Sequence, residues 1–146
     1  MTQEQKELLL TDLCARLAHN PFCKVDGLES PVKLIRIEVD SVDGILLDFD
    51  YKDEQGLPLQ VYLSEIKPYL RSTISMTEEE KKEFVATKYE EVIKQYPCSA
   101  DPTEVKVLSY TTKTFDWLNA HHFDCRGLIP MGLAIKVTEK NNPYKD

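Results

Sequence analysis

The densest group of chemically capable side chains runs from His121 to Arg126 and reads His-His-Phe-Asp-Cys-Arg. Acid–base and nucleophilic catalysis use these residue types. Adjacent histidines on a helix point about 100° apart and cannot both face one ligand. A cysteine nucleophile would also need a base that a third group orients. The pattern therefore favours a structural turn that docks Trp117 and Phe123, and it leaves as weak catalytic candidates His121, His122, Asp124 and Cys125.

A metal hypothesis rests on the cysteines. Cys14, His19 and Cys23 could supply three zinc ligands, with Cys98 or His121 folding over as the fourth. Their spacing is not that of a known zinc finger. Cys14 also falls on a predicted apolar helix stripe, where a buried thiol behaves as a small hydrophobe. We therefore expect neither a metal nor a cofactor.

Acidic residues concentrate between Glu38 and Glu54, where the single basic residue is Lys52. Asp48 and Asp50 should project from the same face of a strand, and two such carboxylates could hold a divalent cation. A solvated sheet face whose charges discourage edge pairing is the ordinary explanation. The functional alternative is an acidic surface for a partner protein with a basic surface, and its candidate residues are Asp48, Asp50, Asp53 and Glu54.

The motifs of phosphate-cradling loops, serine hydrolases and zinc proteases (GxxxxGK[ST], GxGxxG, GxSxG and HExxH) do not occur. The 146 residues include 18 Lys and Arg against 25 Asp and Glu, and the resulting net charge of -7 makes direct nucleic-acid binding an unfavourable hypothesis. No run approaches the roughly 18 apolar residues of a membrane span. With an acidic, polar start and no paired cysteines, the sequence predicts a cytoplasmic protein with reduced thiols.

Helical and strand patterns alternate in the first half of the chain. Residues 3–18 should form a helix, with Thr2 and Gln5 as a capping box and an apolar stripe of Leu9, Leu10, Leu13, Cys14 and Leu17. Alternation within residues 32–51 predicts two strands in an antiparallel hairpin. Residues 59–63 should form a third strand, at an edge because Pro58 begins it. A compact turn should occupy residues 64–70.

The second half predicts another long helix that begins after Thr77, with Glu80 completing a capping box, and ends near residue 95. Its expected apolar stripe is Val85, Tyr89, Val92 and Tyr96. A short strand at 105–107, a helix at 114–121, a strand at 133–137 and a loose tail at 141–146 should follow. The expected fold is α+β in one domain of residues 1–146. A small antiparallel, SH3-like curled sheet in subregion 1–75 should be flanked by the N-terminal helix and the longer central helix of subregion 76–146.

Three parts of the chain carry a resemblance: residues 1–10 (MTQEQKELLL) with 12–17 (DLCARL); 65–71 (EIKPYLR) with 75–80 (SMTEEE); and 116–119 (DWLN) with 122–124 (HFD) and 126–130 (RGLIP). Together they resemble a family of short uncharacterised proteins from human-gut anaerobes, their phages and other mobile elements. The family contributes no activity, cofactor or partner to any residue. Cys125 stands where the resemblance leads us to expect an aromatic residue, which argues against a Cys125 nucleophile. The resemblance implies a bacterial host cytosol and an accessory role.

These observations favour a non-catalytic protein-interaction or regulatory accessory protein, including an inhibitor encoded by a phage or mobile element. The alternative is a small enzyme or metal-dependent protein that uses residues 121–126.

Overall fold

The structure is a computed structural model that describes residues 1–40, 44–95 and 112–145, with the backbone alone described at residues 40 and 88–95. Its helices are α1 (Gln3–Arg16), α2 (Glu78–Gln95) and α3 (Thr112–Ala120). Short 3₁₀ turns are η1 (Leu17–His19), η2 (Leu63–Glu65) and η3 (Thr73–Ser75). The strands are β1 (Phe22–Val25), β2 (Val32–Asp40), β3 (Gly44–Lys52), β4 (Pro58–Tyr62), β5 (Ile66–Leu70) and β6 (Ile135–Lys136).

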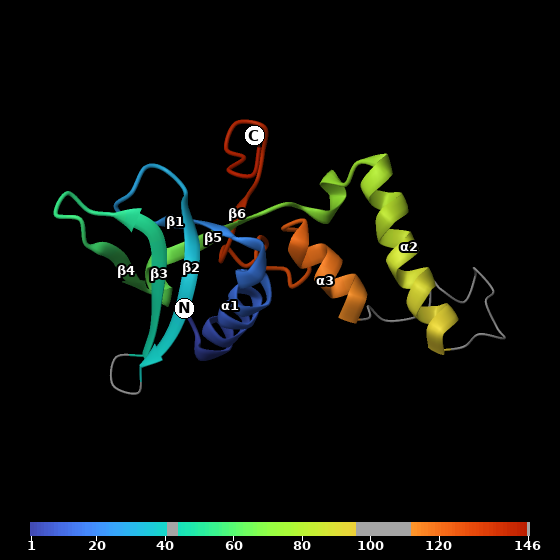
Figure 1. The fold of residues 1–146 in the computed structure, drawn as a ribbon, viewed down its shortest axis with the longest axis horizontal. Helices are drawn as coiled ribbons and strands as arrows, with labels where there is room; N and C mark the ends of the chain where they lie inside the picture. The colour runs from blue at the N-terminus through green and yellow to red at the C-terminus, as the bar shows by residue number, and fades with distance from the viewer. Residues whose placement is uncertain (41–43, 96–111, 146) are drawn as a thin grey trace.

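The strands form one sheet in the order β4-β3-β2-β1-β5-β6, in which only the β5–β6 pair is parallel. Along the length of the molecule the sheet lies at one end, α2 at the other and α3 between them (Figure 1). The α+β prediction is confirmed, the sheet is mixed rather than antiparallel throughout because β6 runs parallel to β5, and the SH3-like curl is not confirmed. No helix in the described ranges is both long and apolar enough to cross a membrane.

The predicted capping box begins α1. The Thr2 hydroxyl accepts from the Gln5 amide at 3.2 Å, and the Gln5 side chain accepts from the Thr2 amide at 2.9 Å. The apolar stripe is rotated from the predicted one, because Cys14 is exposed whereas the charged Asp12 and Arg16 are fully buried. These two charges lie on the helix's inner face and form an ion pair four residues apart, in which Arg16 Nη1 has no hydrogen-bond partner among the described residues.

The core lies between α1 and one face of the sheet. The predicted hairpin is present as β2 and β3, with Leu34 opposite Phe49 and Ile37 opposite Leu47. Pro58 begins β4, which is an edge strand as predicted. Leu9 and Leu13 of α1 belong to the same buried cluster as Leu34, Leu47 and Phe49. Their burial is the main hydrophobic contribution in this half of the molecule.

Two strands were not predicted from the sequence. Residues 64–70 were predicted as a compact turn, but they are the end of η2 and the whole of β5. The four-residue β1 joins β2 to β5, with Cys23 opposite Pro68. The β1–β5 pairing joins segments about 45 residues apart, β1 has four residues, and the proline in β5 is typical of a turn. The local sequence pattern therefore predicted neither strand.

The second capping box is also present, since the Thr77 hydroxyl accepts from the Glu80 amide at 3.1 Å and Glu80 accepts from the Thr77 amide at 2.9 Å. Helix α2 ends at Gln95, as predicted. Val85 is exposed, and the face towards α3 carries Phe84 and Thr87 instead. The side chains of Tyr89, Val92, Tyr96 and Cys98 and the predicted strand at 105–107 lie outside the described residues.

Helix α2 is tied to the end of β5 by an ion pair. Arg71 donates two hydrogen bonds of 2.8 Å to the two carboxylate oxygens of Glu80. These bonds lower the pKa of Glu80. The Arg71 guanidinium also lies 4.2 Å from the centre of the Phe123 ring, so one side chain connects β5, α2 and the segment after α3.

The tail at 141–146 was expected to be loose, but Tyr144 packs against the sheet. The Tyr144 hydroxyl accepts from the Phe22 amide at 3.1 Å and donates to the Tyr69 carbonyl at 2.9 Å. The Tyr144 ring packs edge-on against Phe22 and stacks on His122 at 3.7 Å. The hydroxyl thereby bridges β1 and β5 next to Pro68, which has no amide hydrogen to donate.

Replacing Tyr144→Phe should reduce the free energy of unfolding by about 1–2 kcal/mol, because it leaves a main-chain donor and acceptor unpaired. The matched control is Tyr51→Phe, which alters a tyrosine that is 40% exposed and should change stability by less than about 0.5 kcal/mol. Urea unfolding measures both. Equal effects would show that the tail does not hold the two strands.

Candidate functional site

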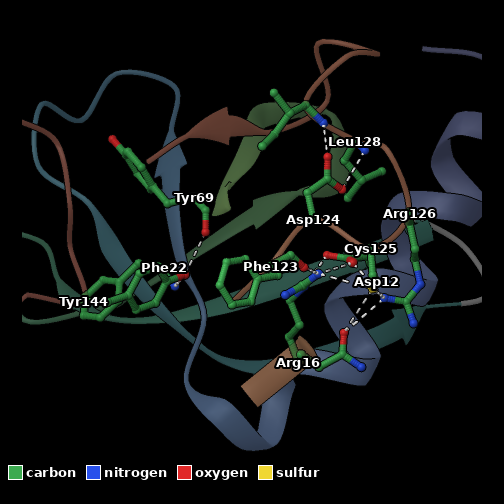
Figure 2. Close-up of polar contacts among 12 residues, drawn as sticks. Asp12, Arg16, Phe22, Tyr69, Phe123, Asp124, Cys125, Arg126, Leu128 and Tyr144 are labelled. Carbon is green, nitrogen blue, oxygen red and sulfur yellow. Dashed lines mark hydrogen bonds and ion pairs between the residues drawn. The ribbon is translucent and has the colours of Figure 1, made fainter. Parts of the chain in front are cut away.

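The cluster at residues 121–126 meets a buried ion pair on α1 (Figure 2). Arg16 Nε and Nη2 donate to the two carboxylate oxygens of Asp12 at 2.8 and 2.9 Å. Both side chains are fully buried. Arg16 Nη2 also donates to the Phe123 carbonyl at 2.6 Å, across 107 residues of sequence. Burying two charges has a high desolvation cost, which such close pairing offsets.

A second arginine shares the same carboxylate. Arg126 Nη1 lies 2.9 Å from Asp12 Oδ1 and 3.1 Å from Asn119 Oδ1. The Cys125 sulfur lies 3.2 Å from this nitrogen, 3.8 Å from Asn119 Oδ1 and 3.9 Å from Arg16 Nη2. Asp12 therefore joins α1 to the segment after α3, and Arg126 links this carboxylate to Asn119 at the end of α3.

Main-chain bonds hold that segment against β5. The Arg71 amide donates to the His122 carbonyl, and the Asp124 amide donates to the Arg71 carbonyl, both at 2.8 Å. The Asp124 carboxylate accepts from the Leu128 and Ile129 amides at 2.9 and 2.8 Å. Asp124 is thus the hydrogen-bond acceptor that organises the next turn (Figure 2).

The two histidines point to different places, as the sequence predicted. His121 Nδ1 donates to the Trp117 carbonyl at 2.9 Å, and its ring stacks on the Trp117 ring at 4.0 Å. Its Nε2 lies 3.9 Å from a Glu83 carboxylate oxygen on α2. His122 instead stacks on Tyr144. The pair cannot serve one substrate or metal ion in this arrangement.

His122 is held as a neutral ring. It is 8% exposed, and its backbone has the left-handed φ of 60°. Burial, followed by the nearby charge of Arg16, lowers the pKa of His122 to about 3. Within the described chain its buried Nδ1 has no hydrogen-bond partner, so a proton on this atom would have no acceptor. A group with this pKa is not a general base near neutral pH.

Cys125 has the wrong environment for a nucleophile. Burial raises the pKa of the thiol despite the opposing effect of Arg126 and Arg16. Of its polar neighbours in the described chain, Asn119 and the two arginines do not accept a proton at neutral pH, and Asp12 is engaged by both arginines. In this arrangement His121, His122, Asp124 and Cys125 each contact another part of the fold.

The proposed zinc ligands are not assembled. Cys14 is exposed on α1, whereas Cys23 is fully buried in β1, where burial and then the Asp12 charge raise its thiol pKa. His19 is half-buried in η1. In the part of the chain that the structure describes, no three His, Cys, Asp or Glu side chains are placed to hold a metal ion. Cys98 lies outside that part.

The acidic candidates have two different roles. Asp48 accepts from Arg36 at 2.6 Å and Gln60 at 2.8 Å, so its charge is compensated across three strands. Asp53 accepts from the Gln55 and Leu57 amides, both at 2.9 Å, and so holds the β3–β4 turn. The two that remain are exposed and form no hydrogen bond or ion pair with any described residue; they are Asp50 and Glu54.

Sequence reasoning missed Asp12, Arg16 and Asn119. A signal was present, because Asp12 and Arg16 fall four residues apart on the same helical face as Leu9 and Leu13. Two opposite charges inside an apolar stripe indicate a buried pair. The contact between Asp12 and a second arginine, Arg126, could not have been predicted from spacing, since the two residues are 114 positions apart.

Replacing Asp12→Asn should lower the free energy of unfolding by about 3–5 kcal/mol, because two arginines lose their shared carboxylate in a buried site. Glu78→Gln is the matched control: Glu78 also pairs on a helix, with Lys81, but is 83% exposed, and the change should cost less than about 1 kcal/mol. Chemical denaturation measures both. A small loss for Asp12→Asn would contradict the account.

His122 should make stability depend on pH. Its folded pKa of about 3 lies below the ordinary 6.5, so the unfolded chain takes up the proton first as pH falls. The contribution of neutral His122 to the free energy of unfolding is fully present above about pH 6.5. It declines towards pH 3, with a slope of at most about 1.4 kcal/mol per pH unit. His122→Asn, which tolerates a positive φ, should flatten the slope between pH 7 and 5, whereas His121→Asn should retain it. Parallel slopes in unfolding experiments would refute this role.

No family model, curated protein or solved structure matches the chain.

Proposed function

We propose that this protein is a non-catalytic interaction protein that binds a basic partner through the surface of β2, β3 and β4, hereafter the wing (residues 32–40 and 44–62). The observation that carries the proposal is the distribution of exposed large hydrophobic side chains. Of nine in the described chain, five lie in the wing: Ile35, Val39, Tyr51, Leu57 and Tyr62. Exposed apolar groups gathered in one region are typical of interaction surfaces.

The end of the β3–β4 hairpin combines these apolar groups with negative charge. Tyr51 is 40% exposed and Leu57 57% exposed, and they flank a turn beside Asp50 and Glu54. The two carboxylates can attract a basic partner, and the apolar side chains can supply buried contact area. Asp48 and Asp53 contribute indirectly, because their hydrogen bonds hold the strands and the turn in shape.

The enzymatic alternative at residues 121–126 has less geometric support. His121 and His122 diverge, Asp124 is engaged by main-chain amides, and burial raises the pKa of Cys125. A structural turn explains these contacts without a substrate. The resemblance to proteins of gut anaerobes and their phages favours a regulator or inhibitor of host machinery, acting in a bacterial cytosol.

The test compares two double variants with equal changes of charge. Asp50→Asn with Glu54→Gln removes the free carboxylates of the wing, and Glu4→Gln with Glu79→Gln removes two exposed carboxylates on α1 and α2. Captures from lysates of gut anaerobes are compared over a range of salt concentrations. The wing variant should recover several-fold less of a specific partner, with a weaker salt dependence, and the helix variant should behave as the parent.

Equal capture by all three proteins would exclude the acidic wing as the binding surface. Leu57→Ser separates the two contributions, since it should weaken capture without changing the salt dependence. Stoichiometric zinc in the purified parent protein would instead favour the metal-dependent alternative.

A further inference from the structure

The outer edge of β4 has a defined set of hydrogen-bonding groups. Among the described strands β4 pairs with β3 alone, and it is the outermost strand of the sheet (Figure 1). In an antiparallel ladder, alternate residues direct their amide and carbonyl groups to the same side. The Tyr62 amide donates to Glu65 Oε2 at 2.8 Å, which identifies it as pointing outwards rather than to β3. Pro58 and Gln60 therefore also point outwards.

These three positions leave the edge nearly closed to another strand. Pro58 has no amide hydrogen, so a proline here removes no bond from the ladder. The Tyr62 amide is occupied by the Glu65 carboxylate. Gln60 is left with the one available outward donor, while its side chain is directed across the sheet by its bond to Asp48. Proteins protect exposed sheet edges in this way.

We propose that Glu65 is a cap on an otherwise self-complementary edge, and that removing it lets two copies of this chain pair through β4. A twofold axis at Gln60 places Tyr62 of one copy opposite Pro58 of the other, as an isologous interface requires. The uncapped edge then offers four main-chain hydrogen bonds: two between the Gln60 residues and one from each Tyr62 amide to the opposite Pro58 carbonyl. With Glu65 in place only the two central bonds remain.

The side chains at this edge are also compatible with a second copy of β4. Tyr62 is 44% exposed, and in the paired arrangement its ring lies beside the other copy's Pro58. Leu59 and Val61 are half-buried, and among the described strands none lies beyond β4. A second β4 would extend the sheet over both. Glu65 lies in η2, directly after the strand, and its carboxylate can therefore reach back to the Tyr62 amide. This one carboxylate controls the pairing of the two β4 edges.

The test measures the oligomeric state of variants by sedimentation velocity over a wide range of protein concentration. Glu65→Ala should produce a concentration-dependent dimer, whereas the parent and Glu65→Gln, which keeps an acceptor oxygen, should remain unpaired through this edge. Adding Gln60→Pro to Glu65→Ala should abolish the dimer, because it removes both central donors while leaving the β3 ladder intact. Circular dichroism confirms that each variant is folded.

A folded Glu65→Ala protein that stays monomeric at every concentration would overturn the proposal, as would a dimer that survives Gln60→Pro. Amide hydrogen exchange on the parent protein provides a test that needs no variant. The Tyr62 amide should be protected and the Gln60 amide should exchange rapidly; the opposite pattern would show that Gln60 faces β3 and that the proposed edge does not exist.

Discussion

The carboxylate of Asp12 is the point on which this fold depends. It lies in the core, fully buried, and receives hydrogen bonds from Arg16 on its own helix and from Arg126 more than a hundred residues later. A buried ion pair adds less net stability than its geometry suggests, because desolvation opposes the attraction. Its stronger effect is on specificity: a misplaced α1 or a misplaced segment after α3 would leave a charge unpaired in the core.

This constraint also decides how the chemically capable residues are to be interpreted. A run of two histidines, an aspartate and a cysteine has the composition of a catalytic site. In the fold its members reach outwards to α2, the tail, the following turn and α1. These side chains connect the segment 121–126 to four other parts of the fold. The wing, which we propose as the binding surface, exposes apolar groups and two carboxylates that have no partner among the described residues.

Local signals in the sequence predicted the parts of the fold that depend on local physics. Both capping boxes, the β2–β3 hairpin and the edge position of β4 follow from hydrogen bonding and side-chain alternation within a few residues. The strand predicted at 133–137 is present as β6, although its partner β5 is distant in sequence. Strands β1 and β5, which pair with each other across about 45 residues, were missed, as was the contact of Tyr144 with Phe22 across 122 residues. The divergence of His121 and His122 was predicted for two residues on one helix, whereas α3 ends at Ala120 and His122 has a left-handed backbone, with its ring stacked on Tyr144. The contact of Cys125 with Arg16 could not be predicted from spacing.

A double-mutant cycle between Asp12 and Arg126 tests the central claim most directly, because the two residues belong to opposite ends of the chain. The free energy of unfolding is measured for the parent, Asp12→Ala, Arg126→Ala and the double variant. The account predicts a coupling energy above about 1 kcal/mol, since the two side chains make a direct hydrogen bond at a buried carboxylate, and either single replacement removes that bond. Additive effects, within about 0.5 kcal/mol, would contradict it.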